Sequence, residues 1–540
     1  RDALDTCGLT DIGYKGRNWT FEKKVAGGTH TRVRLDRCVA NMAWCTAFPN
    51  AITEHREAAS SDHIPIFLDV GGVHACRRDP RTFKYELCWE RDPALAGVVQ
   101  AAWARSPTDS VAGMRDKLHA LATDLSQWDR QHFGNVRAQI KQLQNQLQEM
   151  RGSPGRSGPT GAEIKVTDRL VELYHREEIL WRQRARIEWL KHGDKNTYFF
   201  HLRASRRRRK NKIKALQRND GQLTDDTKEM EAMTMKFYKT LYTSEGVQDM
   251  DQVLDTVPRK VTDEMNATLN APYDIKEVKT ALFQMFPTKA PGPDGFPAHF
   301  FQRHWETCGE EITRMVLRII DGTESAESIN ETILVLIPKV KNPTVLSQFR
   351  PISLCNVFYK IASKVISNRL KLILPDIISE EQSAFVPGRM ITDNIIIAYE
   401  CLHFMKRNKA KKHQSCALKL DMMKAYDRVE WPYLKAIMLK LGFSNRWVNI
   451  VMNMVSTVNF SVLFNGKRLE GFKPTRGIRQ GDPMSPYLFL LAAEGLSCLL
   501  KSRSESSNLE GLQVAPSAPP VNHLSLTDDN LLFFKANSMG

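Results

Sequence analysis

Acidic residues lie at the end of one apolar stretch and within another in the second half of the chain. Asp421 ends the run Ser415-Cys-Ala-Leu-Lys-Leu-Asp421, and the pair Asp528-Asp529 interrupts the run from His523 to Phe534. Mg²⁺ prefers a few carboxylates together with water and substrate phosphates. Two such ions can activate an attacking hydroxyl and stabilise a leaving pyrophosphate. The pattern alone is a weak indication of a metal site, because Asp is also a common turn former.

The elements that position these acids are predicted strands. Residues 415–421 read as a buried strand, and 523–534 as a hairpin with two aspartates and an asparagine at its turn. Residues 332–337 read as a further strand, ended by Pro338. Adjacent side chains on a strand point to opposite faces. We therefore expect at most one of Asp528 and Asp529 to face a site shared with Asp421.

The middle of the chain, from about 90 to 245, has a helical pattern. Ile140, Leu143, Leu147 and Met150 recur at steps of three and four residues, which predicts a helix with one apolar seam. Residues 152–161 are rich in Gly, Ser and Pro and predict a flexible connection. A second helical stretch covers about 163–202, so this region is predicted to be a helical hairpin with a loose tip.

A basic run follows the predicted hairpin. It contains Arg206, Arg207, Arg208, Arg209 and Lys210, with Lys212 and Lys214 beyond and aromatic residues 198–200 just before. Cations that contact phosphates and aromatic rings that stack on bases are typical of nucleic-acid binding. A solvated basic face or a nuclear-import signal is the alternative interpretation.

Length, composition and charge limit the class of protein. The chain has 540 residues, which suggests about three units. Its formal net charge is +16 and its apolar fraction is 42%, which favours a folded protein with a polyanionic partner. Ten scattered cysteines without a CxxC pair indicate reduced thiols. No apolar run approaches the roughly 18 residues of a membrane span. Because the first residue is Arg1, we expect the chain to begin inside a longer reading frame.

Several motifs together resemble the reverse transcriptases of plant-type non-LTR (LINE) retrotransposons. They occur in the order that this family shows, and several match its LINE version in particular. In this sequence they are Ala290-Pro-Gly-Pro-Asp-Gly295, Leu336-Ile-Pro-Lys339, Phe349-Arg-Pro-Ile-Ser-Leu354, Gln382-Ser-Ala-Phe-Val-Pro-Gly-Arg389, Lys419-Leu-Asp-Met-Met-Lys-Ala-Tyr-Asp-Arg-Val-Glu-Trp431, Arg476-Gly-Ile-Arg-Gln-Gly-Asp-Pro-Met-Ser-Pro486 and Leu526-Thr-Asp-Asp529.

The resemblance implies a role for each acidic residue. Asp421 and Asp528 are expected to bind two Mg²⁺ ions, with Mn²⁺ as an alternative, and Asp529 is expected to support them. Asp427 is expected to make a structural hydrogen bond or ion pair. The third palm motif departs from the family, which has Phe or Tyr and then Ala before the two aspartates. Leu526 and Thr527 stand there and put catalytic activity in doubt.

The resemblance also implies a nucleotide site. Lys339 and Arg350 are expected to hold the incoming triphosphate, since Arg offers a fork to phosphate and Lys a point charge. Gln480 and Gly481 are expected to line the site, where glycine allows close backbone approach. Tyr426 fits a steric gate under the sugar that favours deoxynucleotides, with an aromatic core residue as the alternative.

The front of the chain resembles the end of an apurinic-endonuclease-like domain. The similar segments are 18–21, 34–37 and 61–63. His63 is expected to act at a phosphate, with Asp36 orienting its ring and Asp62 nearby. A surface loop is the alternative for the Ser-Asp-His segment. The family's metal-binding Glu lies further upstream, so this part is not expected to cut DNA. Residues 189–201 also resemble the linker between the two enzymes.

The expected fold is α+β. Residues 1–70 are predicted to be the end of an α/β-sandwich nuclease, 71–260 a helical basic linker, and 261–540 the fingers and palm of a right-hand polymerase with its thumb truncated. The expected partners are an RNA template, a DNA primer or target and deoxynucleoside triphosphates, without a membrane. We expect an intracellular protein whose parent element acts in the nucleus.

Two alternative functions remain open at this point. One is a catalytically inactive, truncated remnant that at most binds nucleic acid, which the departure at Leu526 and Thr527 favours. The other is a polymerase of the group II intron or telomerase type. The nuclease-like segments and the linker motif at 189–201 favour the LINE type over the latter.

Overall fold

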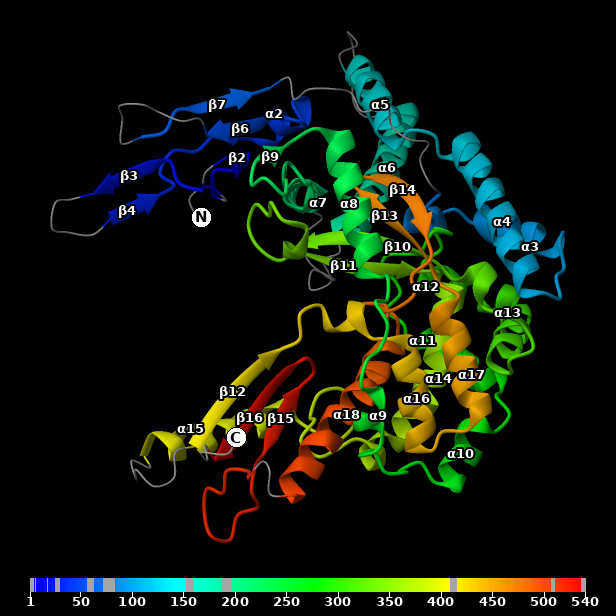
Figure 1. Ribbon diagram of the computed structural model, residues 1–540. Coiled ribbons are helices and arrows are strands. Elements are labelled where there is room, and N and C mark those ends of the chain that lie inside the picture. The colour runs from blue at the N-terminus through cyan, green and yellow to red at the C-terminus, as the bar shows by residue number, and fades with distance from the viewer. Residues whose placement is uncertain are drawn as a thin grey trace. The chain divides into compact units, whose positions relative to one another are not determined.

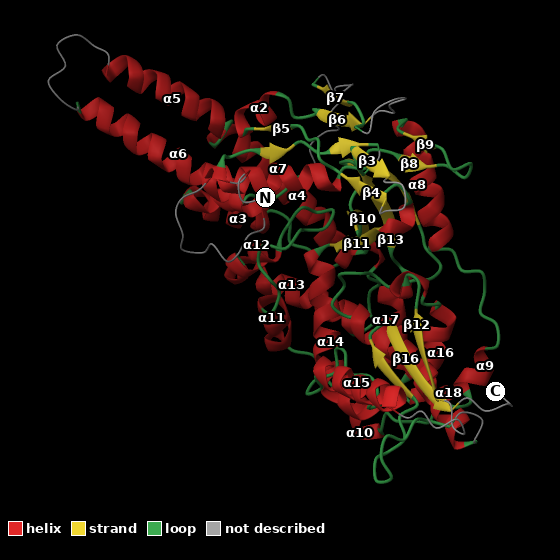
Figure 2. Cartoon of the chain, turned by 90° about the vertical axis from the view of Figure 1, so that its left-hand side faces the viewer, coloured by secondary structure: helices red, strands yellow, loops and turns green. Residues whose placement is uncertain are grey.

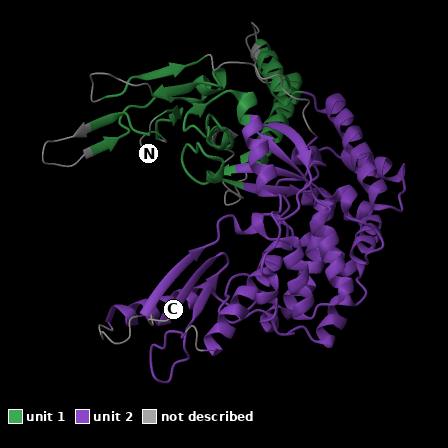
Figure 3. Cartoon of the chain, in the orientation of Figure 1, with its two compact units in different colours: residues 1–82, 135–230, 337–350 green, residues 83–134, 231–336, 351–540 purple. Residues whose placement is uncertain are grey.

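The computed structural model describes residues 4, 6–16, 18–24, 30–55, 63–70, 83–151, 160–185, 197–407, 415–506 and 510–535. Contacts divide the chain into two compact units, which Figure 3 distinguishes by colour. Unit 1 consists of residues 1–82, 135–230 and 337–350, and unit 2 of residues 83–134, 231–336 and 351–540. Both units contain helices and strands, which confirms the α+β class.

Unit 1 starts with short strands. The order of its three-stranded sheet is β2-β6-β7, and β1 pairs with β5, β3 with β4, and β8 with β9. The strands are β1 (Thr10–Asp11), β2 (Tyr14–Lys15), β3 (Phe21–Lys24), β4 (His30–Val33), β5 (Val39–Ala40), β6 (Ile52–His55), β7 (Ile66–Asp69), β8 (Leu216–Gln217) and β9 (Leu223–Thr224), and the short helix α2 (Met42–Ala47) precedes β6.

A pair of long helices also belongs to unit 1. Helices α5 (Val136–Arg151) and α6 (Gly161–Ala185) lie side by side (Figure 2) and bury Ile140 and Leu147 against Leu170 and Leu173. The predicted helical hairpin and its apolar seam are thus confirmed. Its predicted tip at 152–159 and residues 186–196 of the linker motif lie outside the described residues. Helix α7 (Thr197–Asn211) then carries the basic run.

Unit 2 is built mainly from helices. They are α3 (Ala94–Ala104), α4 (Val111–His132), α9 (Met250–Leu254), α10 (Asp263–Asn270), α11 (Ile275–Phe283), α12 (Ala298–Arg303), α13 (Trp305–Ile320), α14 (Val357–Ile377), α15 (Ile391–Arg407), α16 (Trp431–Leu441), α17 (Asn445–Ser456) and α18 (Ser485–Glu505). Helix α8 (Thr227–Leu241) begins in unit 1 and continues into unit 2.

Helix α4 packs on α13 through a buried ion pair. Lys117 of α4 lies 2.5 Å from a carboxylate oxygen of Glu311, and its ammonium also sits 4.4 Å from the centre of the Trp103 ring. Residues 83–134 belong to the same compact unit as residues 261–336 and 351–540 of the predicted polymerase.

A four-stranded sheet has the order β11-β10-β13-β14. Strand β10 (Glu331–Pro338) runs parallel to β13 (Asn459–Phe464), which pairs antiparallel with β14 (Lys467–Phe472), and β11 (Phe349–Cys355) forms the other edge. The predicted strand at 332–337 is confirmed. Burial alternates along β10, as expected for a β-branched run, and proline ends it.

A separate three-stranded sheet has the order β12-β16-β15 and is antiparallel (Figure 1). Strand β12 covers Ser415–Asp421, as predicted, and β15 (His523–Leu526) and β16 (Asp529–Lys535) form the predicted hairpin. The prediction that β12 is buried is wrong, because it is an edge strand of this sheet and its residues are half-buried or exposed. The turn, however, contains Thr527 and Asp528, while Asp529 and Asn530 already belong to β16. Leu526 pairs with Asp529 and leaves the two-residue loop that hairpins favour.

No helix in the described part of the chain is long and apolar enough to cross a membrane.

Candidate active site

The acidic residues gather at one edge of the three-stranded sheet. Asp421, the last residue of β12, lies directly opposite Asp529, the first residue of β16. Directly opposed residues in an antiparallel pair point to the same face. Asp421 and Asp529 therefore share one face, and Asp528 stands in the adjoining turn. Asn530 points to the other face, where its amide oxygen accepts a hydrogen bond of 2.6 Å from Ser525.

Lys419 brings a positive charge into this group of acids. It precedes Asp421 by two residues and so points to the same face, and its ammonium lies 3.0 Å from a carboxylate oxygen of Asp529. The hydrogen bond to Asp529 raises the pKa of Lys419, and the charges of Asp529, Asp421 and Asp528 add to this effect. All three acids therefore act on one ammonium group. The Lys-x-Asp spacing could have identified Lys419 from the sequence, but we did not predict its role.

The turn between β15 and β16 has an unusual backbone. Thr527 has a φ of 66°, a left-handed conformation that β-branched residues rarely adopt. Its N–H donates a hydrogen bond of 3.3 Å to the side-chain oxygen of Gln382, which belongs to the segment 382–389. The segment also forms a bridge from Gln382 to Ser525. The upstream motif therefore supports the turn that carries Asp528.

Tyr426 lies near the acids. Its ring stacks on Phe489 with 5.0 Å between ring centres, and its carbonyl accepts a hydrogen bond of 2.8 Å from the Ile478 N–H. Burial and the charge of Asp528 raise the pKa of Tyr426 to about 12. The half-buried ring is thus held by packing beside the carboxylate of the turn, which is compatible with the predicted steric gate.

Gln480 and Gly481 form a turn that is joined to strand β11. The Gln480 carbonyl accepts a hydrogen bond of 2.8 Å from the Ser353 N–H. Gly481 has a φ of 117°, and a Cβ atom there would lie 3.0 Å from the Ser353 carbonyl oxygen. Both facts favour glycine at this position. The Gln480 amide lies 3.4 Å from the Asp427 carboxylate, which is buried and makes the structural hydrogen bond that we predicted.

A buried ion pair between the two flanking residues stabilises this turn. Arg479 and Asp482 lie on either side of Gln480 and Gly481, and their charged groups approach to 2.8 Å with side chains that are 4% and 3% exposed. Arg479 also donates to the Asn330 side chain and the Met454 carbonyl. Asp482 accepts from Tyr359 and Ser363. Neither residue was predicted to have a structural role, although both belong to the motif at 476–486.

The carboxylates fit a divalent metal by their chemistry. Asp421 and Asp529 on one face, with Asp528 beside them, supply the few carboxylate oxygens that Mg²⁺ uses together with water and phosphates. Within the described ranges, no group of three or more His, Cys, Asp or Glu side chains is assembled closely enough to hold a metal by itself.

Lys339 and Arg350 belong to unit 1. Lys339 directly follows β10, Arg350 is the second residue of β11, and both side chains are exposed. The Lys339 N–H donates a hydrogen bond of 2.9 Å to the Gln348 carbonyl, which closes the connection between the two strands. Their predicted contact with a triphosphate remains a prediction.

The basic run on α7 is partly engaged within unit 1. Arg206 donates a hydrogen bond of 3.2 Å to the Thr10 hydroxyl, whereas Arg207, Arg208 and Lys210 are exposed. Lys214 donates to the Tyr14 carbonyl at 2.9 Å, and burial lowers its pKa to about 8. The cations that suit a phosphate backbone are therefore those exposed on α7, while Arg209 is only partly exposed.

The nuclease-like residues are also in unit 1. The imidazole Nδ1 of His63 lies 2.9 Å from a carboxylate oxygen of Asp36, and this hydrogen bond lowers the pKa of Asp36. The Asp36 N–H donates to the Thr20 hydroxyl. The Asp36 and His63 side chains are therefore in contact, and the orienting role of Asp36 stays a prediction; Asp62 lies outside the described residues.

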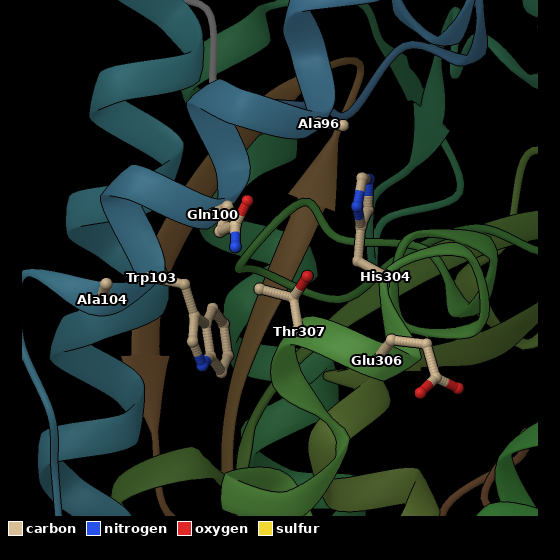
Figure 4. Close-up of a pocket in the computed structure, with 7 residues that line it drawn as sticks. All are labelled: Ala96, Gln100, Trp103, Ala104, His304, Glu306 and Thr307. Carbon is tan, nitrogen blue, oxygen red and sulfur yellow. The ribbon is translucent and has the colours of Figure 1, made fainter.

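A pocket of about 430 Å³ opens between α3 and the junction of α12 and α13 (Figure 4). No predicted site residue lines it, and Glu306 is its one carboxylate, so it lacks the paired acids of the sheet edge. The lining residues are Ala96, Gln100, Trp103, Ala104, His304, Glu306 and Thr307.

Comparison with known proteins defines the class. Residues 337–539, which contain all three acids, Tyr426 and Gln480, match the family described as reverse transcriptase (RNA-dependent DNA polymerase). The "Transposon TX1 uncharacterized 149 kDa protein" of Xenopus laevis is 28% identical over 74% of this chain and 32% of its own length. The "Retrovirus-related Pol polyprotein from type-2 retrotransposable element R2DM" of Drosophila melanogaster is 25% identical over 54% of this chain and 25% of its own length.

An uncharacterized mitochondrial protein of Arabidopsis thaliana is 45% identical over 13% of this chain and 60% of its own length. The chain thus spans about a third or less of the two long relatives. Residues 337–539 thus match the reverse transcriptase family, and the chain is similar to proteins of a transposon and of retrotransposable elements.

Proposed function

We propose that the chain is the RNA-directed DNA polymerase part of a LINE-type retrotransposon protein. It adds deoxynucleotides to a DNA primer along an RNA template. The observation that carries this proposal is the sheet edge where Asp421 and Asp529 share one face and Asp528 stands in the adjoining turn. That edge lies inside the matched reverse transcriptase domain. We further propose that the four-stranded sheet belongs to the fingers and the three-stranded sheet to the palm.

Each group contributes a separate part of the reaction. Asp421 and Asp528 would hold Mg²⁺ or Mn²⁺, and Asp529 would support them. A bound pair of ions supplies Lewis-acid chemistry at the primer hydroxyl and the triphosphate. Tyr426 excludes a ribose 2′-hydroxyl, and the turn at Gln480 and Gly481 borders the nucleotide. Lys339 and Arg350 are the cations for the triphosphate.

RNA-templated primer extension tests this function. The purified chain is incubated with an RNA template, a labelled DNA primer, the four deoxynucleoside triphosphates and Mg²⁺. Extension that follows the template sequence supports the proposal. A reaction without template and a reaction with ribonucleotides serve as controls. Absence of template-directed extension in both Mg²⁺ and Mn²⁺ would contradict the proposal.

Nucleic-acid binding without DNA synthesis is a second candidate function. The left-handed backbone of Thr527 beside Asp528 favours it, since strain at this turn can displace a metal ligand. Binding itself is proposed to involve the exposed cations of α7. We also propose that His63 and Asp36 belong to an endonuclease-like domain and that the parent element acts in the nucleus.

Replacing Arg207, Arg208 and Lys210 by serine is expected to lower the affinity for RNA and to make that affinity depend less steeply on salt concentration. Each lost phosphate contact lowers the slope of log K against log salt by about 0.7 for single strands, so three contacts lower it by about 2. Fluorescence titration with single-stranded RNA at several salt concentrations measures this slope. The control replaces Arg105, Arg115 and Arg314 by serine, which removes the same number of positive charges elsewhere in the chain. Equal slopes in the α7 variant and the parent would show that the run is only a solvated face.

A further inference from the structure

The end of helix α8 lies upstream of the matched domain, but it is hydrogen-bonded to the segment that precedes the turn at Gln480 and Gly481. The Tyr242 carbonyl accepts hydrogen bonds from the N–H groups of Thr475, at 2.9 Å, and Arg476, at 3.3 Å. The Arg476 side chain returns a hydrogen bond of 2.9 Å to the Leu241 carbonyl. Residues 241–242 therefore hold the segment that leads into Gln480.

The Tyr242 ring is packed beneath the same segment. It is 2% exposed and lies 4.8 Å from the Phe460 ring and 6.3 Å from the Phe472 ring, between ring centres. Gly477 passes directly over it with a φ of 92°, and a Cβ atom there would lie 2.9 Å from the Tyr242 ring. Glycine at 477 thus allows a close approach that fixes the ring and the turn together.

The Tyr242 hydroxyl reaches the one carboxylate that also contacts Gln480. It donates a hydrogen bond of 2.8 Å to Oδ1 of Asp427, and the Gln480 amide approaches the same oxygen at 3.4 Å. Burial and the nearby charge of Asp427 raise the pKa of Tyr242 well above its usual value, so the hydroxyl keeps its proton. The bond from Tyr242 is the shorter of the two, so we infer that it fixes the position of this oxygen. The position of the Gln480 side chain then depends on that oxygen.

A second connection runs parallel to the first. The Ser244 hydroxyl donates a hydrogen bond of 2.6 Å to Glu430, whose other carboxylate oxygen pairs with Arg476 at 3.2 Å. The Ser244 N–H donates to the Thr475 hydroxyl at 2.7 Å. Residues 241–244 thus join the segment after Asp421 to the segment before Gln480 at two places.

We propose that Tyr242 is a positioning residue of the deoxynucleotide site, acting through Asp427 on the Gln480 side chain. This inference rests on the proposed polymerase function. It extends the nucleotide site to a residue outside the matched domain. Its specific consequence is that the Tyr242 hydroxyl affects nucleotide affinity more than it affects the binding of the primer–template duplex.

The test compares Tyr242→Phe with Tyr238→Phe. Both tyrosines are on or next to α8, both are buried, and their rings stack with 6.5 Å between centres. Among the residues that the structure describes, the Tyr238 hydroxyl has no hydrogen-bond partner, so its removal is a matched control. Both variants keep the aromatic ring and therefore the packing.

The readout is the dissociation constant of a complementary deoxynucleoside triphosphate. It is measured with Mg²⁺ on the chain bound to an RNA–DNA duplex whose primer ends in a dideoxynucleotide, so that no chemistry occurs. Because a hydrogen bond to a charged group is lost, Tyr242→Phe is expected to weaken nucleotide binding about tenfold. Tyr238→Phe is expected to bind like the parent, and duplex affinity is expected to be equal in all three proteins.

A double variant shows whether the effect passes through Gln480. If it does, Tyr242→Phe has no further effect on nucleotide affinity once Gln480→Ala is present. Equal affinity in Tyr242→Phe and the parent, equal weakening by both tyrosine variants, or full additivity with Gln480→Ala would each overturn the inference. So would a parent that binds no nucleotide. A parent that binds nucleotide but does not extend an unblocked primer contradicts the polymerase function instead, and the measured affinities still decide the role of Tyr242.

Discussion

Replacing Asp421 by asparagine is expected to reduce RNA-templated primer extension about a thousandfold, because it weakens the binding of a metal ion that would supply several kcal/mol of charge stabilisation at the reacting phosphate. Asparagine keeps the size of the side chain and removes its charge. Asp421 is exposed at the end of β12, so the fold is expected to tolerate the change. Initial rates of single-nucleotide addition at saturating nucleotide measure the effect.

The same assay separates the roles of the two neighbouring acids. If Asp528 is the second metal ligand, Asp528→Asn has an effect close to that of Asp421→Asn, and Asp529→Asn has a smaller one. Asp529, however, lies opposite Asp421 and contacts Lys419. A larger effect of Asp529→Asn than of Asp528→Asn would therefore show that Asp529 is the second metal ligand. Asp376→Asn, an exposed acid on α14, is the control and is expected to extend like the parent. Full activity in Asp421→Asn would remove the basis for the catalytic assignment.

Replacing Asp482 by asparagine is expected to lower the free energy of unfolding by about 3–5 kcal/mol, because it leaves a buried guanidinium without its carboxylate. The Arg479 and Asp482 side chains are almost completely buried, and Tyr359 and Ser363 both donate to the carboxylate that is lost. Urea unfolding followed by tryptophan fluorescence measures the change. The turn with Gln480 and Gly481 is expected to lose order with it.

Two further variants isolate the buried charge. Glu327→Gln removes an exposed ion pair with Lys473 and is expected to leave the urea midpoint unchanged, since exposed pairs contribute little. Arg479→Met combined with Asp482→Leu removes both charges and is expected to recover most of the lost stability. A double variant as unstable as Asp482→Asn would show that the surrounding hydrogen bonds, rather than the unpaired charge, stabilise this region.

Local patterns in the sequence predicted the strands that carry the acids. The apolar runs at 332–337 and 415–421 predicted β10 and β12, and the run at 523–534 predicted the hairpin. The turn was placed one residue too late, because two adjacent aspartates look like turn formers whether or not the second one pairs. Register depends on the partner strand, and a single sequence does not reveal that partner.

The supporting contacts were not predicted because they join residues far apart in the chain. The Tyr242 side chain is hydrogen-bonded to Asp427, and the Arg479 side chain to Asn330, across long sequence separations. An amphipathic helix shows that one face is buried but not what covers it. For the same reason the region predicted as a linker at 71–260 contains helices α3 and α4, which belong to unit 2, where α4 packs on α13. The boundaries at 70 and 260 remain predictions.

The position of Tyr242 has a practical consequence for preparing a smaller polymerase. A fragment that starts at residue 337, where the matched domain begins, would lack the ring that covers Phe460 and Phe472. Two large aromatic side chains would then face water, and exposed apolar patches of this kind promote self-association. Such a fragment would aggregate for a reason unrelated to its catalytic residues. A soluble minimal enzyme therefore has to include the end of α8 and everything that α8 needs in order to fold.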